Sequence, residues 1–173
     1  VFASPPPPDG WIFEQYGLSY DEASLISYLQ NGFPQDVLDK NGEQMDARQR
    51  WSYVYPEAVR LLAKEKSEAA VPILCDMLTA LPPALAADLE ALIVSVEESD
   101  REREYKLAFF QAACAMALRE TGSDNAVLAL ASFARRLLPE LKPNIETGNY
   151  PAYLVAFREA CISLVLLGEE EGV

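Results

Sequence analysis

Residues 107–118 read LAFFQAACAMAL, and Gln111 is the only strongly polar residue among them. A helix with this sequence is apolar on every face except at Gln111, and such a helix must be covered by neighbours on several sides. We therefore predict that a helix over 101–120 is the central helix of the domain. It begins at the charged Arg101–Glu104 and ends at Gly122.

Apolar residues recur at helical spacing on both sides of this segment. Ser19 and Glu22 form a capping-box pattern at the start of the first helix. Proline disfavours helical geometry in the residue before it, so Pro56 is expected to push Tyr55 toward extended geometry and split one helical stretch in two. Further helices are predicted over about 44–54, 56–65, 83–97 and 152–167, from Ser67 to Pro82, and from Ser123 or Asp124 to a connection over Pro139–Pro151.

No stretch alternates with period two, so the predicted fold class is all-α. The 173 residues, half of them hydrophobic, suit one domain with a substantial core. Residues 1–18, which contain four consecutive prolines, are predicted to form an extended proline-rich arm held to the body by Trp11–Phe13. Residues 19–173 are predicted to form a single all-helical domain, in which Phe33-Pro34 begins a short helical turn.

The chain is strongly acidic, with 27 Asp and Glu against 14 Lys and Arg, a formal charge of −13. This charge disfavours nucleic acid, because binding to phosphates depends on Lys and Arg that displace counterions. Anionic membrane surfaces are disfavoured for the same reason. No run of apolar residues is long enough to span a membrane, so no membrane insertion is predicted. Another protein, and in particular a basic one, is the partner that the charge favours.

The chain has no histidine and three cysteines, Cys75, Cys114 and Cys161, each among apolar neighbours. The missing histidine excludes His-based triads and His-containing zinc sites. The cysteines are far apart and form no Cys-x-x-Cys pair, so we expect them to pack as small hydrophobic residues. We predict no catalytic residues, no metal and no cofactor, and therefore no enzyme. An enzyme that uses carboxylates alone is the less favoured alternative.

Two stretches of the chain echo each other. Ala63–Leu74 and Leu118–Leu130 each join the end of an alanine-rich helix to a polar corner, where Ser and an acid open a second helix. A third helix end, over Glu159–Glu169, repeats the first half. The alanine-rich helices are 55 residues apart from Ala58 to Ala113, and 47 residues apart from Ala113 to Ala160.

Residues 112–127, AACAMALRETGSDNAV, resemble HEAT-like repeat proteins in their alanine-rich helix, Gly-Ser-Asp corner and second-helix start. The resemblance covers about 57–168 and is carried mainly by 112–130. It implies a short stack of antiparallel helix pairs that serves as a protein-binding scaffold, and it supplies no catalytic residues. The steps are longer than a typical unit and the family's Asp-x-x-Val-Arg signature is missing. An irregular helical bundle is therefore the alternative architecture.

Candidate partner-binding residues come from two aromatic clusters and one acidic cluster. Trp51 and Tyr55 fall on a predicted core stripe, whereas Tyr53 points elsewhere, so Tyr53 is the better surface candidate. Cations beside aromatic residues form protein hot spots, and binding residues concentrate in long loops. The acids lack the spacing of a calcium loop. The candidates are Arg50, Tyr53, Glu97, Glu98, Tyr150 and Tyr153.

These observations predict a non-enzymatic protein-binding module or scaffold with an acidic surface. A small acidic inhibitor or immunity-type protein that blocks a basic toxin or enzyme is one alternative, and an accessory subunit of a larger assembly is another. The opening Val1–Ala3 and the proline run fit an exported protein as well as a truncated start. The cytoplasm is slightly favoured, and export to a periplasm or lumen stays open.

Overall fold

The computed structural model describes residues 7–95, 99–147 and 151–170. Their regular secondary structure is helical, apart from an isolated antiparallel bridge between Leu38 and Gln44, which confirms the all-α prediction. The elements are α1 (Trp11–Gln15), α2 (Glu22–Asn31), α3 (Ala47–Gln49), a π-helix (Arg50–Val54), α4 (Tyr55–Lys64), a 3-10 turn (Glu68–Ala70), α5 (Val71–Met77), α6 (Pro83–Ser95), α7 (Asp100–Thr121), α8 (Asp124–Glu146) and α9 (Leu154–Glu170).

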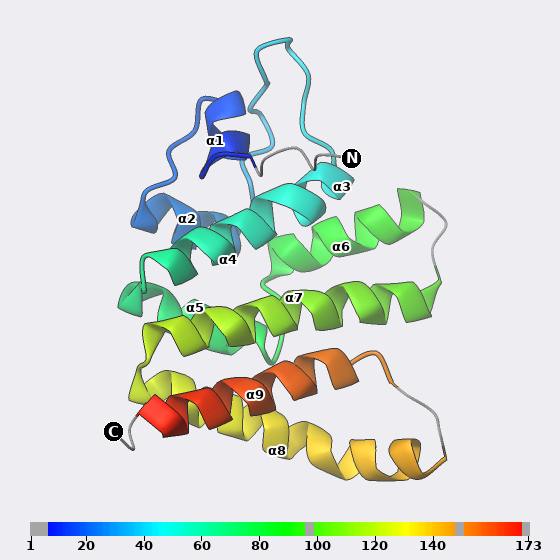
Figure 1. The fold of residues 1–173 in the computed structure, drawn as a ribbon. Coiled ribbons are helices and arrows are strands. Elements are labelled where there is room, and N and C mark those ends of the chain that lie inside the picture. The colour runs from blue at the N-terminus through cyan, green and yellow to red at the C-terminus, as the bar shows by residue number, and fades with distance from the viewer. Residues whose placement is uncertain (1–6, 96–98, 148–150, 171–173) are drawn as a thin grey trace, which may run out of the picture.

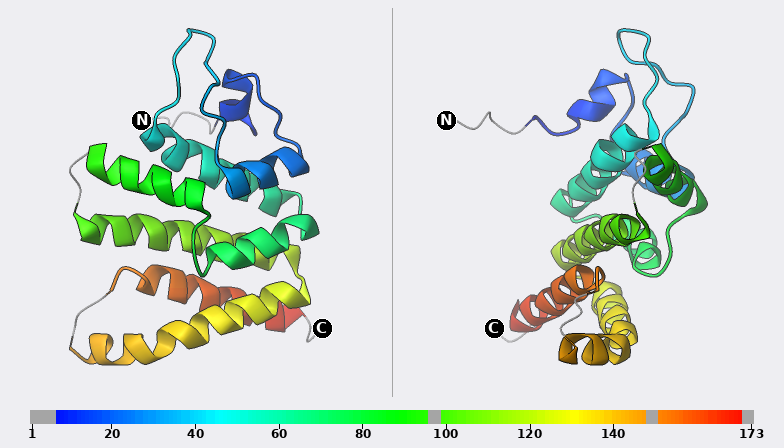
Figure 2. Two further views of the ribbon diagram at one scale, coloured as in Figure 1. Left: turned by 180° about the vertical axis from the view of Figure 1, so that it is seen from behind. Right: turned by 90° about the vertical axis from the view of Figure 1, so that its right-hand side faces the viewer.

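The helices form two layers. Helices α4, α7 and α9 lie side by side and run in the same direction, as Figure 1 shows, while α5, α6 and α8 run the opposite way behind them. The view from behind in Figure 2 places α2 in that second layer as well. Helix α7 packs against α4, α5, α6, α8 and α9, so it is the central helix that its apolar sequence predicted.

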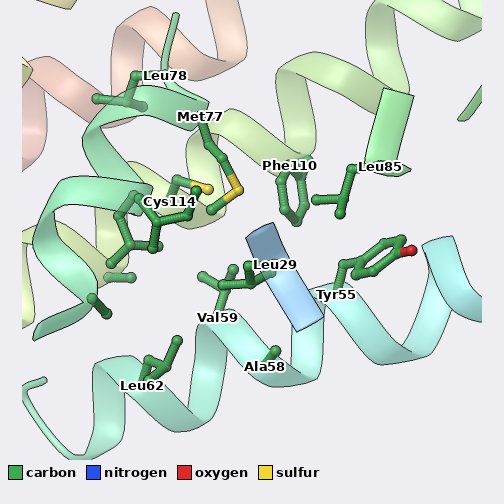
Figure 3. Packing of buried hydrophobic residues seen from close by; sticks show 14 of the residues in the cluster. Leu29, Tyr55, Ala58, Val59, Leu62, Met77, Leu78, Leu85, Phe110 and Cys114 are labelled. Carbon is green, nitrogen blue, oxygen red and sulfur yellow. The ribbon is translucent and has the colours of Figure 1, made fainter. Parts of the chain in front are cut away.

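The core is built between these layers from large apolar side chains and the small residues of α7. Leu62 of α4, Met77 of α5 and Cys114 of α7 have no exposed surface, and Figure 3 shows how they gather with their neighbours. Burying a side chain of this size stabilises the fold by about 1.5–3 kcal/mol. Gln111 is buried too, and its Nε2 donates a hydrogen bond to the carbonyl oxygen of Leu78 at 3.1 Å.

The expectation that residues 107–118 are covered on nearly every side is only partly met. Phe109 and Met116 are 61% and 44% exposed, whereas Phe110 and Leu118 are buried. Phe109 and Met116 are seven residues apart, so they share one face of α7. That face is the outer surface of the α4–α7–α9 layer, where no described helix covers it.

Several predicted helix ends are confirmed by their caps. Gly122 ends α7 with φ of +63°, as predicted, whereas the capping box that Ser99 and Glu102 form at the start of this helix was not predicted. The Oγ atoms of Ser67 and Ser123 each accept a hydrogen bond from a backbone N–H three residues on. The predicted cap at Ser19 is wrong. Asp21 caps α2 by accepting from the Ser24 N–H, and the Ser19 hydroxyl donates to Asp21 instead.

Pro56 and Pro139 do not end helices where the sequence predicted. Tyr55 has helical dihedrals, φ −68° and ψ −43°, and the chain passes without a break from α3 through the π-helix into α4. The wider π-turn accommodates Pro56, whose missing N–H falls in the first turn of α4. Pro139 and Pro143 lie inside α8. Both are exposed, so water can bond the carbonyl groups that they leave free.

The N-terminal segment also differs from its prediction. Trp11–Gln15 form the short helix α1 rather than part of an extended arm, and Ile12 and Phe13 are buried in the core. Residues 7–18 therefore belong to the body of the fold. The short helical turn expected from Phe33-Pro34 is absent: these residues lie in the loop between α2 and α3, which holds the Leu38–Gln44 bridge.

Candidate functional site

Large side chains are exposed along the outer face of the α4–α7–α9 layer. Tyr53, just before α4, is 49% exposed, and the face of α7 that holds Phe109 and Met116 lies beside α4. Exposed apolar side chains that gather on one face are typical of interaction sites, whereas single ones are normal on any protein. This face is therefore the candidate functional site.

Two adjacent hollows run along α4 on this face. The first, of about 180 Å³, lies between α4 and α7 and is lined by Val59, Ala113 and Met116 among others. The second, of about 260 Å³, lies at the start of α4 and includes Trp11 and Tyr53. Pro56 and Arg60 line both hollows. We call the two hollows together the α4–α7 groove.

The sequence forms the groove by placing small residues between large ones. Ala63 on α4 faces Ala113 and Ala117 on α7 in the first hollow, so the two helices approach without filling the space between them. Pro56 adds an apolar ring without a backbone donor. Met116 stands at the edge, and methionine adapts its shape to irregular partners. The first hollow is therefore shallow, apolar and adaptable.

The charged side chains at the groove pair with one another. Arg60 bonds Glu57 and Asp9, each at 2.6 Å, and Lys64 also bonds Asp9. The Lys64 ammonium and the Arg60 guanidinium lower the pKa of Asp9. The Gly10 N–H donates to Glu57 at 2.9 Å, which ties the N-terminal segment to α4. Two cations thus face two carboxylates, and the groove is locally near neutral in a strongly acidic chain.

The second hollow has aromatic walls. The rings of Trp11 and Tyr53 meet edge to face, with centroids 5.8 Å apart and an angle of 70° between their planes. Pro7 and Pro56 complete the apolar lining. Within the described part of the chain, neither the indole N–H of Trp11 nor the Tyr53 hydroxyl has a hydrogen-bond partner. Both groups are free to donate to a ligand.

Arg50, predicted to bind a partner, is buried. Its Nε donates to Asp88 Oδ2 at 2.8 Å, its Nη2 to Asp88 Oδ1 at 2.6 Å, and its Nη1 to the Met45 carbonyl oxygen. The Tyr55 hydroxyl also donates to Asp88. Burial and this hydrogen bond raise the pKa of Tyr55. Arg50 therefore joins the π-helix to α6, and the prediction that it lies on the binding surface is corrected.

The remaining predicted candidates do not gather with Tyr53. Tyr153 is half-buried, accepts a hydrogen bond from Asn144 and lines neither hollow. Tyr150, Glu97 and Glu98 lie outside the described residues. Sequence reasoning missed Trp11, Pro56 and Met116. Met116 was hidden because residues 107–118 are apolar on every face, so no polarity difference marked its face as the outer one.

A third hollow, of about 410 Å³, lies between α5 and the start of α8, and Cys75 and Glu68 are among its lining residues. Burial raises the pKa of Cys75, which disfavours the reactive thiolate. Among the described residues, the carboxylates that line these three hollows are Glu68, Glu120 and Glu57, one in each.

Within residues 7–95, 99–147 and 151–170, no group of three or more Cys, Asp or Glu is placed to hold a metal ion. Among the helices of these same residues, none has the length and apolar character needed to cross a membrane. Comparisons of the chain with protein-family models, with curated proteins and with solved structures give no match.

Proposed function

We propose that this chain is a non-enzymatic protein-binding module that holds a segment of another protein in the α4–α7 groove. The observation that carries the proposal is that the exposed Tyr53 and Met116 line an apolar groove, with the exposed Phe109 on the same face of α7 as Met116. Tyrosine and methionine are enriched at protein interfaces. Binding energy concentrates in a few such side chains.

We also propose that the architecture is a HEAT-like stack. In support, α7 and α8 are antiparallel neighbours in contact, and α4, α7 and α9 follow one another in a single layer. The sequence echo falls at the corners that end α4 and α7. Helix α6 lies between α5 and α7 in the sequence, and this additional helix accounts for the long spacing of 55 residues from Ala58 to Ala113. Stacks of this kind use their extended faces for binding.

A polypeptide fits the groove better than a small molecule does. Pockets for small ligands are concave and usually about 300–1,000 Å³. The two hollows measure about 180 and 260 Å³ and share Pro56 and Arg60 of α4 as lining residues. An elongated ligand with side chains spaced along it can fill both hollows, whereas a compact ligand fills only one.

The net charge keeps a second candidate open, a small acidic inhibitor of a basic protein. A charge of −13 attracts a basic partner and so raises its association rate. Salt limits this attraction to distances comparable to the Debye length. The groove itself is near neutral, because Asp9 and Glu57 are paired with cations. The inhibitor function therefore requires acidic residues outside the groove to contact the partner.

Site-specific photo-cross-linking tests the proposed function. A photo-reactive residue replaces Met116 in the groove or, as the control, Leu128 on α8, which is 68% exposed. In an extract of the source cells, we expect discrete cross-linked proteins from position 116 only. Excess wild-type chain should suppress them, and excess Met116→Glu chain should not. The same products from both positions would refute a specific groove.

The identity of the cross-linked protein separates the two candidate functions. A single basic toxin or enzyme bound at one copy per chain favours the inhibitor. Several subunits of one assembly favour an accessory subunit. A partner whose cross-links map to one short segment favours the binding module, and mass spectrometry of the cross-linked peptides measures this.

A further inference from the structure

The second hollow differs in chemistry from the rest of the α4–α7 groove. Trp11 and Tyr53 form two of its walls and Pro7 and Pro56 contribute apolar rings. The described residues that line the first hollow, in contrast, include no aromatic side chain. The aromatic lining of the second hollow therefore indicates which kind of partner side chain binds there.

We propose that this end of the groove binds a proline-rich segment of the partner in the polyproline II conformation. This inference rests on the proposed function and specifies its ligand. Polyproline II helices have no internal hydrogen bonds, so their carbonyl groups are available as acceptors. Grooves that recognise them are lined by aromatic rings, and the preformed ligand loses little entropy on binding.

The free donors of the hollow match this ligand. The Trp11 indole N–H and the Tyr53 hydroxyl have no partner within the described residues, and they stand on rings that meet edge to face. A segment laid across these rings packs its pyrrolidine rings against them, while its carbonyl groups accept from both donors. An α-helical ligand cannot do so, because its internal carbonyl groups are already bonded.

The charge of the hollow also fits an uncharged ligand. Arg60 is engaged by Glu57 and Asp9, and Glu57 also accepts from the Gly10 N–H. A charged ligand group would have to compete with these pairs for its partner. Proline residues carry no charge and require no such exchange.

The chain itself shows a proline in place at this site. Pro7, from the run of four consecutive prolines, forms part of the wall of the hollow. A pyrrolidine ring and two aromatic rings thus line one hollow within the molecule. The proline run of a second copy is the main rival occupant, and the experiment must separate it from a partner's segment.

The test uses the whole chain labelled with ¹⁵N and unlabelled decaproline as the probe. The chain has two tryptophans, so its spectrum has two indole N–H signals, which a Trp11→Phe variant assigns. We expect decaproline to shift the Trp11 signal in a saturable way and to leave that of the buried Trp51 in place. A Gly-Ser peptide of equal length should shift neither signal.

Variants of Tyr53 then test the contacts. Tyr53→Phe removes the donor and should weaken decaproline binding about 2- to 10-fold. Tyr53→Ala also removes the ring and should weaken it at least about 10-fold. The matched control is Tyr153→Phe, which removes a hydroxyl outside the groove and should leave affinity unchanged. An unmoved Trp51 signal in each variant shows that the fold is intact.

Three results would overturn the inference. One is a Trp11 signal that stays in place with excess decaproline. Another is equal binding by wild type and Tyr53→Ala. The third is a Trp11 signal that moves with protein concentration alone, which identifies a second copy as the occupant. If photo-cross-links from position 116 persist in any of these cases, the proposed function stands and only the ligand is wrong.

Discussion

Replacing Asp88 by Ala should destabilise the fold more than any surface substitution. Asp88 accepts two hydrogen bonds from Arg50, at 2.8 and 2.6 Å, and a third from the Tyr55 hydroxyl. The Arg50 and Asp88 side chains are 10% and 8% exposed. Without this carboxylate, the guanidinium is a buried charge that has lost its hydrogen-bonded counterion.

The magnitude follows from this burial. Removing one partner of a buried ion pair costs about 3–5 kcal/mol. The Tyr55 hydroxyl, left without its acceptor, adds about 1–3 kcal/mol. Domains are stable by about 5–15 kcal/mol, so the loss is a large share of the total. In a domain of this size, about 3 kcal/mol lowers Tm by about 6–12 °C.

Urea unfolding followed by circular dichroism measures the effect. A triple variant, Arg50→Met with Asp88→Leu and Tyr55→Phe, removes every polar group of the cluster. It should be more stable than Asp88→Ala, because well-packed apolar residues often replace a buried ion pair without loss. Two results would contradict the structural role assigned to this cluster. One is a free energy of unfolding of Asp88→Ala within about 1 kcal/mol of wild type. The other is a triple variant that is no more stable than Asp88→Ala.

Three further predictions concern backbone, thiol and pH. A Cβ at Gly32 would lie 2.7 Å from the Ala84 methyl group of α6, whereas a Cβ at Gly122 would meet open space. Both glycines have positive φ, so the backbone strain of alanine is common to the two sites. Gly32→Ala should therefore lower the urea midpoint more than Gly122→Ala. Cys114 is fully buried, so mass spectrometry should show that iodoacetamide labels it only at the rate of unfolding; rapid labelling would contradict this. The Ser19 hydroxyl and backbone N–H groups of α2 lower the pKa of Asp21 from 3.8. The resulting stability is present above about pH 4 and is lost as pH falls through the folded pKa, so the advantage of wild type over Asp21→Asn in urea midpoint should shrink toward pH 2.

The all-helical fold and the central position of α7 could be predicted because each depends on local pattern. Residues 107–118 are apolar at every helical angle, and only a helix with several neighbours can bury them. The end at Gly122 and the caps at Ser67 and Ser123 follow from chemistry that involves adjacent residues alone. Such features depend little on how distant segments meet.

The errors arose where tertiary context decides the outcome. The π-turn before Pro56 keeps Tyr55 helical, which places its hydroxyl on Asp88 of another helix. The same partner, 38 residues away in sequence, draws Arg50 inside. No spacing rule links residues at this separation, so Arg50 was indistinguishable from a surface cation.

Of the candidate binding residues predicted from the sequence, Tyr53 is the one that lines the groove within the described part of the chain. Tyr53 was separated from Trp51 and Tyr55 by its angle on the helix, and it lines the groove as expected for a surface residue. Trp11 joins it because the N-terminal segment is held to the body, in part by the bonds of Gly10 and Asp9 to Glu57 and Arg60 of α4. These contacts join residues that are 47 and 51 positions apart in the sequence, so they left no local signal.

The most direct test of the proposed binding face is the affinity of the cross-linked partner for two single variants of the whole chain. Met116→Glu places a charge in the groove, and Leu128→Glu places the same charge on α8, where the side chain is more exposed. By titration calorimetry, we predict a loss of at least about 10-fold for Met116→Glu and less than about 2-fold for Leu128→Glu. Equal losses, or a larger loss at position 128, would contradict the assignment of the α4–α7 groove as the binding surface.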